Sequence, residues 1–240
     1  MVKLGKSVTT ALFAAGTIAL ASLAACSDSA TSNDQATVTM QSQLSSSSTS
    51  LAKAAVGTSA VGVDSVSITR IRMFVRRLKL HRSATDTTGD KDVKTAPFVI
   101  TFENQAKTFV SLQIPPGTYD KVKFEFHRPE SSQITEYLGI PEFVDFVTND
   151  RYSVIYEGNV YMDGTGTAIP FTYRSDMTAN LSLNLEQEIT FAEGSNNTIM
   201  MMVDPADVFT KAGELLDPRD PRNENEIDNN IKAAIKVHKK

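Results

Sequence analysis

Residues 63–82, with the sequence VDSVSITRIRMFVRRLKLHR, contain neither glycine nor proline and are rich in β-branched side chains. Such a composition favours a strand over a helix or a loop. The apolar side chains alternate in pieces, and the phase of the alternation slips between Ile68 and Ile71 and again near Phe74. A β-bulge inserts one extra residue and shifts the phase in this way. The segment therefore predicts one long, bulged strand, and a chain that holds such a strand must fold around a β-sheet.

Shorter segments with strand patterns fill most of the chain after residue 97. Pairs of apolar runs flank polar turns, as in FVITF and KTFVSL, RYSVIYEGNVYM and AIPFTYRS, and ANLSLNLEQEITF and TIMMMV. The cleanest alternation follows a Pro-Gly turn, where Val122, Phe124 and Phe126 face one way and the charged residues between them face the other. The sequence therefore predicts a mainly β fold of antiparallel sheets, each with one face in the core.

The carboxyl-terminal part carries helix patterns instead. An Asp-Pro pair followed three residues later by aspartate predicts a helix over residues 205–212. A second helix is predicted over residues 224–238, because acidic residues fill its first turn and lysines its last turns, as the helix dipole favours. Ile227, Ile231 and Ile235 form one apolar stripe along it. We expect this helix to dock on the sheets or to cover a sheet edge.

The amino-terminal residues carry a targeting pattern. Lys3 and Lys6 precede a segment of small and apolar side chains, and no acidic residue appears before Asp28. This is the layout of a secretory signal peptide, whereas a membrane-spanning helix needs about 20 predominantly apolar residues. We therefore predict a signal peptide over residues 1–25 and a flexible polar tether over residues 26–35.

The only cysteine of the chain stands directly behind the apolar segment. The ending Leu23-Ala24-Ala25-Cys26 resembles the lipobox of bacterial lipoproteins. The resemblance implies that a lipid is attached to the sulfur of Cys26, that the chain is cut before Cys26, and that the protein is exported and anchored to a membrane. In known sorting patterns, an aspartate directly after the cysteine keeps a lipoprotein from reaching the outer membrane. This chain has Ser27 at that position, which favours the outer membrane. The alternative is a buried free cysteine in an ordinary helix.

An anchor at Cys26 leaves the rest of the chain without cysteine. Disulfides, thiol catalysis and thiolate metal sites are then excluded, even in an oxidising exported environment. Loss of residues 1–25, which carry two lysines and no acidic residue, changes the formal charge from −4 to −6. This acidic balance argues against a nucleic-acid partner. The basic residues of segment 63–82 are accordingly interpreted as a solvated strand face.

Four segments together resemble a known group of proteins. They are VDSVSITRIRMFVRRLKL, IPPGTYDKVKFEFHRPE, YEGNVYMDGTGTAIPFTYRSDM and LLDPRDPRNENEIDNNIKAAIK. They look like segments of uncharacterised bacterial envelope lipoproteins with an immunoglobulin-like or transthyretin-like β-sandwich. The resemblance implies one antiparallel sandwich domain over residues 36–240 with a short C-terminal helical segment. It implies no reaction and no binding residues, and Val208-Phe209 departs from the Trp-Phe that similar proteins often carry.

Two groups of residues are candidates for chemistry. Glu125 and His127 share the wet face of one strand and have the side chains of an acid–base pair, although no serine stands in an elbow motif and we interpret them as a solvated pair. The segment DPRDPRNENEID offers oxygen ligands for calcium at Asp217, Asp220, Asn223, Glu224 and Glu226. Their spacing does not match an EF-hand loop, and the prolines between them fit a stiff connector equally well. We therefore predict no metal site and keep calcium as an alternative.

Three classes of function stay open. A binding or adhesion module would present loops 83–96 and 130–149, a structural envelope protein would use its sheet faces or terminal helix, and an enzyme would need a convergent polar cluster. We expect a lipid-anchored envelope protein with a non-catalytic binding, adhesion or scaffolding role and no cofactor. Its expected partners are the membrane, through the anchor, and an envelope protein or glycan. A calcium-binding envelope protein is the alternative, and a hydrolase is the least supported.

Overall fold

Strands dominate the computed structural model, which describes residues 35–45, 50–52, 62–86, 92–162, 164–205 and 208–239. The predicted signal peptide (1–25) and Cys26 lie outside the described residues, as does all of the predicted tether except Gln35. Gln35 and the other described residues belong to one compact unit, Ser32–Lys240. No helix in these ranges is both long enough and apolar enough to span a membrane.

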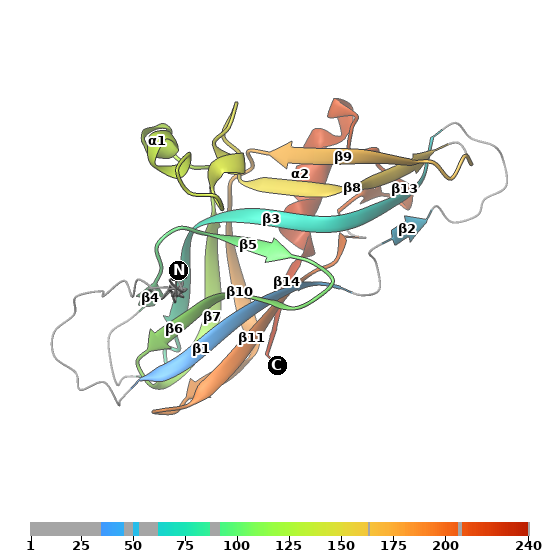
Figure 1. The fold of residues 1–240 in the computed structure, drawn as a ribbon. Helices are drawn as coiled ribbons and strands as arrows, with labels where there is room; N and C mark the ends of the chain where they lie inside the picture. Colours follow the sequence, from blue (N-terminus) through green and yellow to red (C-terminus); the bar gives the residue numbers. More distant parts are fainter. Residues whose placement is uncertain are drawn as a thin grey trace, which may run out of the picture. The chain divides into compact units, whose positions relative to one another are not determined.

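Two large sheets form the fold in the described part of the chain (Figure 1). The four-stranded sheet has the order β14 (Ile235–Lys239), β11 (Asn196–Val203), β1 (Ala36–Leu44) and β6 (Lys107–Ile114). The eight-stranded sheet has the order β10 (Ala179–Phe191), β7 (Gly117–Phe126), β3 (Val63–Arg82), β8 (Val154–Met162) and β9 (Ala168–Ser175), and β2 (Ser50–Ala52), β4 (Asp92–Lys94) and β5 (Phe98–Phe102) also pair with β3. The predicted mainly β fold of antiparallel sheets is confirmed.

One strand pair departs from the antiparallel rule. β1 and β11 run parallel, from Thr37 opposite Asn196 to Leu44 opposite Val203. Parallel neighbours cannot be joined by a tight hairpin and need a long crossover. Here the crossover comprises the strands from β2 to β10, most of which pair in the other sheet. In the four-stranded sheet, β1 therefore comes from the start of the described chain and β11 and β14 from its end, while β6 comes from its middle.

β3 is the long bulged strand that the sequence predicts. Its first half pairs with β8 and its second half with β7. The register with β8 shifts between Ile68 and Arg70, and the register with β7 shifts between Val75 and Arg77. These are the places where the alternation of apolar residues slips in the sequence, so the bulges are confirmed. One strand thus connects the two halves of the eight-stranded sheet.

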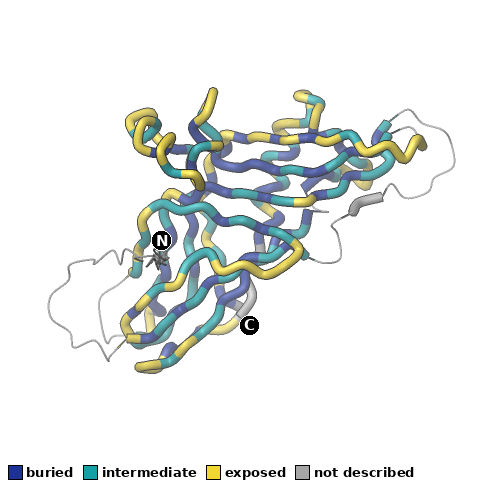
Figure 2. Tube along the Cα trace, in the orientation of Figure 1, coloured by how far each residue is buried: buried dark blue, intermediate teal, exposed yellow. Residues whose placement is uncertain are grey.

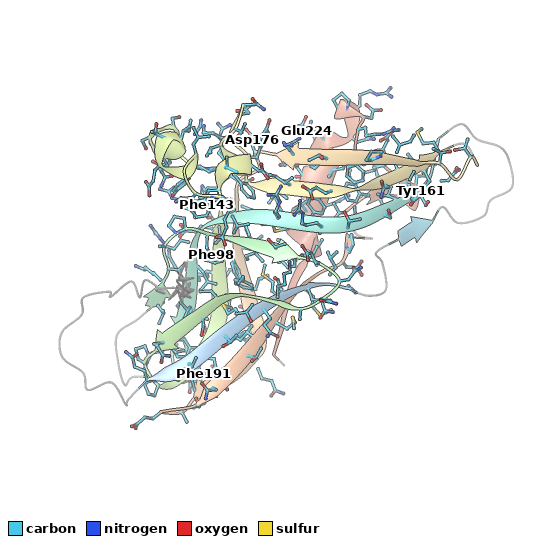
Figure 3. All side chains as sticks on the ribbon, in the orientation of Figure 1. Phe98, Phe143, Tyr161, Asp176, Phe191 and Glu224 are labelled. Atoms are coloured by element: carbon cyan, nitrogen blue, oxygen red, sulfur yellow. The ribbon has the colours of Figure 1, made fainter. Side chains whose placement is uncertain are left out.

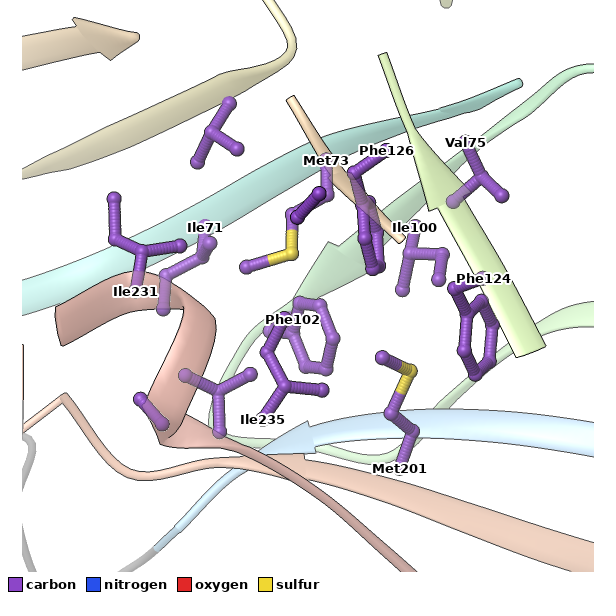
Figure 4. Packing of buried hydrophobic residues seen from close by; sticks show 14 of the residues in the cluster. Ile71, Met73, Val75, Ile100, Phe102, Phe124, Phe126, Met201, Ile231 and Ile235 are labelled. Carbon is purple, nitrogen blue, oxygen red and sulfur yellow. The ribbon is translucent and has the colours of Figure 1, made fainter. Parts of the chain in front are cut away.

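The hydrophobic core lies between the two sheets, as Figure 4 shows for residues of β3, β5, β7 and β11. Val122, Phe124 and Phe126 are fully buried in it, while the charged residues between them are half-buried on the other face of β7. Figure 2 shows the same alternation along several strands. The predicted orientation of β7 is confirmed. Met201 of β11 also packs in this core.

Residues 130–149, one of the loops that a binding or adhesion module would present, fold into a cover on the eight-stranded sheet. The segment contains η1 (Ser131–Gln133), α1 (Ile134–Tyr137) and η2 (Val144–Phe146). Tyr137, Phe143 and Phe146 form a second buried cluster with Phe74 of β3, on the face opposite the main core. Figure 3 shows Phe143 between this cover segment and the sheet. Both faces of β3 are buried here, which explains why Met73, Phe74 and Val75 are apolar without alternation.

The predicted helix over residues 205–212 is wrong at its carboxyl end. Residues 206–207 lie outside the described ranges, but Thr210–Lys211 forms strand β12, which pairs with β13 (Glu214–Leu215). Val208 and Phe209 are both fully buried in the main core. The side-chain amide of Asn230 donates to the carbonyls of Val208 and Thr210, at 3.1 and 2.9 Å. These two carbonyls therefore accept hydrogen bonds from a side chain of the following helix, and not from backbone N–H groups of a helical turn at residues 208–212.

The second predicted helix is shorter than expected. After a 3-10 turn, η4 (Pro221–Asn223), helix α2 covers Glu224–Ala234, and Ile235 onward forms β14 beside β11. Ile227 and Ile231 are fully buried, so the expected docking of the apolar stripe on the sheets is confirmed. Ile235 belongs to the same stripe but already lies in the strand. The β-branched side chains of the segment IKVHK favour this change to a strand once β11 offers a free edge.

Candidate functional site

Glu125 lies on the outer face of β7, which points away from the main core, and His127 comes directly after the end of this strand. They line a hollow of about 380 Å³ that β3, β7 and β10 form together. Its lining residues are Lys79, Lys123, Phe124, Glu125, His127, Asn180, Leu181 and Ser182. This first hollow falls within the usual volume range of ligand pockets, about 300–1,000 Å³. Its polar side chains point outward because they alternate with core residues on each strand.

Glu125 is held as a carboxylate by its basic neighbours. Lys79 Nζ lies 2.9 Å from Glu125 Oε1, and an Arg77 guanidinium nitrogen lies 3.8 Å from the same oxygen. The hydrogen bond from Lys79, together with the charges of Lys79 and Arg77, lowers the pKa of Glu125 below its ordinary value, against a smaller opposing effect of burial. At neutral pH this group is an anion and cannot act as a general acid.

His127 takes an amide as its partner. Its Nε2 lies 3.0 Å from Asn180 Oδ1, across the β7–β10 pair. Ser182 lines the same hollow but lies opposite Lys123 in the strand register. Among the described residues, no hydroxyl or carboxylate forms a hydrogen bond with His127. The acid–base pair of the sequence is therefore brought into one hollow without the relay that nucleophilic or general-base catalysis needs.

The calcium candidates are spread over separate ion pairs. Asp217 binds Arg219 at 2.7 Å, Asp220 binds Arg222 at 2.6 Å, and Glu226 binds Lys211 at 2.9 Å. The side chain of Asn223 donates to the backbone carbonyl of Asp217. The bond from Arg219 lowers the pKa of Asp217. The ranges that the structure describes contain no cluster of three or more acidic, histidine or cysteine side chains placed to hold a metal ion.

A second polar cluster stands at the end of β3. The side chains of Arg82 and Asp86 are 5% and 8% exposed and pair at 3.1 Å. Arg82 also donates to the carbonyl of Pro116, and Asp86 accepts from the backbone N–H of Thr118. Gly117 lies between these partners with φ +150°, where a Cβ would collide with both charged side chains. Arg82 is therefore a structural cation, and its interpretation as part of a solvated strand face is wrong.

Most other basic residues of β3 also have acidic partners. Arg70 and Arg72 both bind Glu157 of β8, and Arg72 also reaches Asp145 of the cover segment at 2.6 Å. The Arg72–Asp145 pair attaches the cover segment to the sheet, whereas the two pairs with Glu157 join β3 to β8. The pairs on the outer face neutralise much of the charge that the sequence shows as a basic run.

Sequence reasoning missed most of the residues that line the first hollow. Lys79, Asn180 and Ser182 join Glu125 and His127 only because β3 and β10 flank β7 in a particular register. The polar alternation of each strand is visible in the sequence, but the choice of neighbours is not. Comparisons of this chain with protein-family models, curated proteins and solved structures found no match.

Proposed function

We propose that the protein is a lipid-anchored cell-envelope protein, held by Cys26 in the outer membrane, with a non-catalytic binding role. The support for the anchor is the lipobox-like sequence of residues 23–26 behind a signal-like segment. From the separate resemblance of four later segments to envelope lipoproteins, we propose that the fold is a sandwich of the immunoglobulin-like or transthyretin-like kind.

The observation that carries the binding role is the first hollow. It is a concave surface on a rigid sheet, lined mostly by polar residues. Glu125, Lys79 and His127 have partners within it, in the pairs Glu125–Lys79 and His127–Asn180. Such groups orient a ligand by charge and hydrogen bonds, whereas a catalytic site would leave an acid or base free to exchange a proton. A binding surface on strands is also positioned more rigidly than one on loops.

A thermal-shift screen of the full-length protein, purified in detergent, tests this proposal. We expect envelope glycans or envelope extracts to raise the melting temperature, because a ligand that binds only the native state stabilises it. We expect the rise to persist in the presence of a chelator. A rise with calcium alone that the chelator abolishes would support the calcium alternative. A measured turnover that His127→Ala abolishes would replace the binding role with a hydrolase.

A further inference from the structure

Three lysines from three strands lie directly opposite one another beside the first hollow. Lys94 of β4 is opposite Lys79 of β3, and Lys79 is in turn opposite Lys123 of β7. We call these three residues the lysine row. Because neighbouring strands are about 4.8 Å apart, the row places three ammonium groups on one face within roughly 10 Å of chain width. Like charges directly opposite each other destabilise a sheet, so the row costs stability.

The acidic residues nearby do not cancel the row. Lys79 has Glu125 as its partner, while no carboxylate of the described residues pairs with Lys94 or Lys123. Lys121 points to the same face and lies 3.9 Å from Asp120. The basic residues of this face are Arg77, Lys79, Lys94, Lys121 and Lys123, and the acidic ones are Asp92, Asp120 and Glu125. The face is therefore positive on a chain whose formal charge is −4.

A second hollow extends this face beyond the lysine row. It measures about 430 Å³ and is lined by Arg76, Arg77, Thr95, Ala96, Pro97, Glu130, Ser132 and Gln133. Arg77 lines the second hollow and also lies 3.8 Å from Glu125, which lines the first. The two hollows therefore meet at this ion pair. Together they form a long polar track with hydroxyl and amide groups at both ends.

The lining of the track narrows the chemistry of its ligand. The one phenylalanine, tyrosine or tryptophan of the lining, Phe124, is fully buried, and the imidazole of His127 is held by Asn180. Neither hollow therefore offers a row of exposed aromatic rings on which successive bases or neutral sugars could stack. Leu138 is the exposed large hydrophobic residue of the described chain and lines neither hollow, which disfavours an apolar protein partner. A concave track also matches a polymer chain better than a flat bilayer.

The cations of the track that lack acidic partners are lysines. Arg76 and Arg77 already face Glu130 and Glu125, and the lysines act as point charges that attract carboxylates and phosphates alike. We propose that the track binds an acidic polysaccharide, whose charge is carried by carboxylate or phosphate groups. The hydroxyl and amide groups of the track would then bind the sugar hydroxyls. This inference rests on the proposed binding role and names its ligand class.

Binding of the full-length protein, purified in detergent, to immobilised polygalacturonate tests the inference. We expect binding that weakens as salt is added, because the contacts are charge pairs near the surface. Neutral dextran should not bind. Lys123→Glu and Lys94→Glu should each weaken binding about tenfold, as reversal of a contacting charge does in other charged interfaces. Lys232→Glu on α2 makes the same charge change away from the track and should leave binding unchanged.

The inference fails if dextran binds equally well, or if all three variants bind like the parent protein. It also fails if the lysine variants lose binding only to vesicles of anionic lipid, or if neither the polyuronate nor a phosphorylated glycan binds. Binding of the phosphorylated glycan alone would assign the charge of the polysaccharide to phosphate groups. Melting temperatures at or above that of the parent protein show that the variants are folded, since each lysine variant also relieves repulsion within the row. Fatty-acid labelling of the same preparations separates this failure from failure of the proposed anchor, since labelling does not depend on the track.

Discussion

At the scale of single residues, the face that a side chain occupies decides what it does. On β7, Phe124 is fully buried and Lys123, its neighbour, is on the outer face. On β3, Arg82 and Arg77 stand five positions apart, yet one is buried in an ion pair and the other lines a hollow. The alternation on β7 is readable from the sequence. The burial of Arg82 is not, because it depends on Asp86 and the Pro116 carbonyl meeting it at one corner.

We predict that Phe124→Ala lowers the free energy of unfolding by about 3–5 kcal/mol, because it leaves a cavity between the sheets. Lys123→Ala should change it by less than about 0.5 kcal/mol, because its side chain lies on the outer face and removal of a like charge beside Lys79 offsets any lost packing. Denaturant midpoints of the two variants measure the difference. Equal losses, or a larger loss at Lys123, would show that the assigned faces of β7 are wrong.

A second residue-scale prediction concerns acid stability. Burial raises the pKa of Glu157, but Arg70 and Arg72 more than offset this and hold it below its ordinary value of 4.5. A carboxyl group with a lowered pKa in the folded state stabilises the protein above its ordinary pKa. That contribution is lost as the pH falls through the lower value.

We therefore expect the melting temperature of Glu157→Gln to lie below that of the parent protein at pH 7. The gap should narrow as the pH falls below about 4.5, where the parent carboxyl begins to take up its proton. Glu214→Gln, an exposed change in β13, is the control and should follow the parent at every pH. A gap that stays constant from pH 7 to pH 3 would contradict the role of the arginines.

At the scale of elements, local sequence patterns predicted the helices and strands correctly wherever contacts between distant residues did not change the local structure. The bulges of β3 and the docking of Ile227 and Ile231 follow from residues close in sequence. Residues 130–149 look like a loop because their contacts are with Phe74, more than 50 positions away. Ile235 continues the helical spacing of Ile227 and Ile231, but it pairs with β11 as a strand residue. Pairing with a free sheet edge stabilises this residue more than one further residue at the end of a short helix would.

The cover segment gives a prediction for an element. Phe74 contacts Tyr137, Phe143 and Phe146, with ring centroids 5.5–6.0 Å apart. Phe74→Ala should therefore lower the free energy of unfolding by about 3–5 kcal/mol. It should loosen residues 131–146 more than the strands of the sheet. Hydrogen exchange measures this by segment, with the amides of β7 and β10 as internal reference. Uniform loss of protection would show that the cover and the sheet unfold as one unit.

At the scale of the whole molecule, the candidate site is a product of topology. Lys79, Lys123 and Asn180 come from strands that the sequence order does not place together. β7 stands between β3 and β10, and this arrangement turns three ordinary amphipathic strands into one polar track. The sequence could supply the residue types and their faces. It could not supply the strand order, because many orders satisfy the same alternation.

The last prediction concerns where the whole molecule resides. Cys26→Ser should abolish incorporation of a fatty-acid probe and release the chain from the membrane fraction, because no thioether can form at a serine. Each buried CH₂ of an acyl chain contributes about 0.8 kcal/mol to membrane binding, so loss of all chains removes the proposed anchor. Ser29→Ala changes the tether but keeps the cysteine, and it should label and fractionate like the parent protein. Continued labelling of Cys26→Ser would show that the lipid, if any, is attached elsewhere. An unlabelled variant that stays in the membrane fraction would show that a different segment holds the protein there.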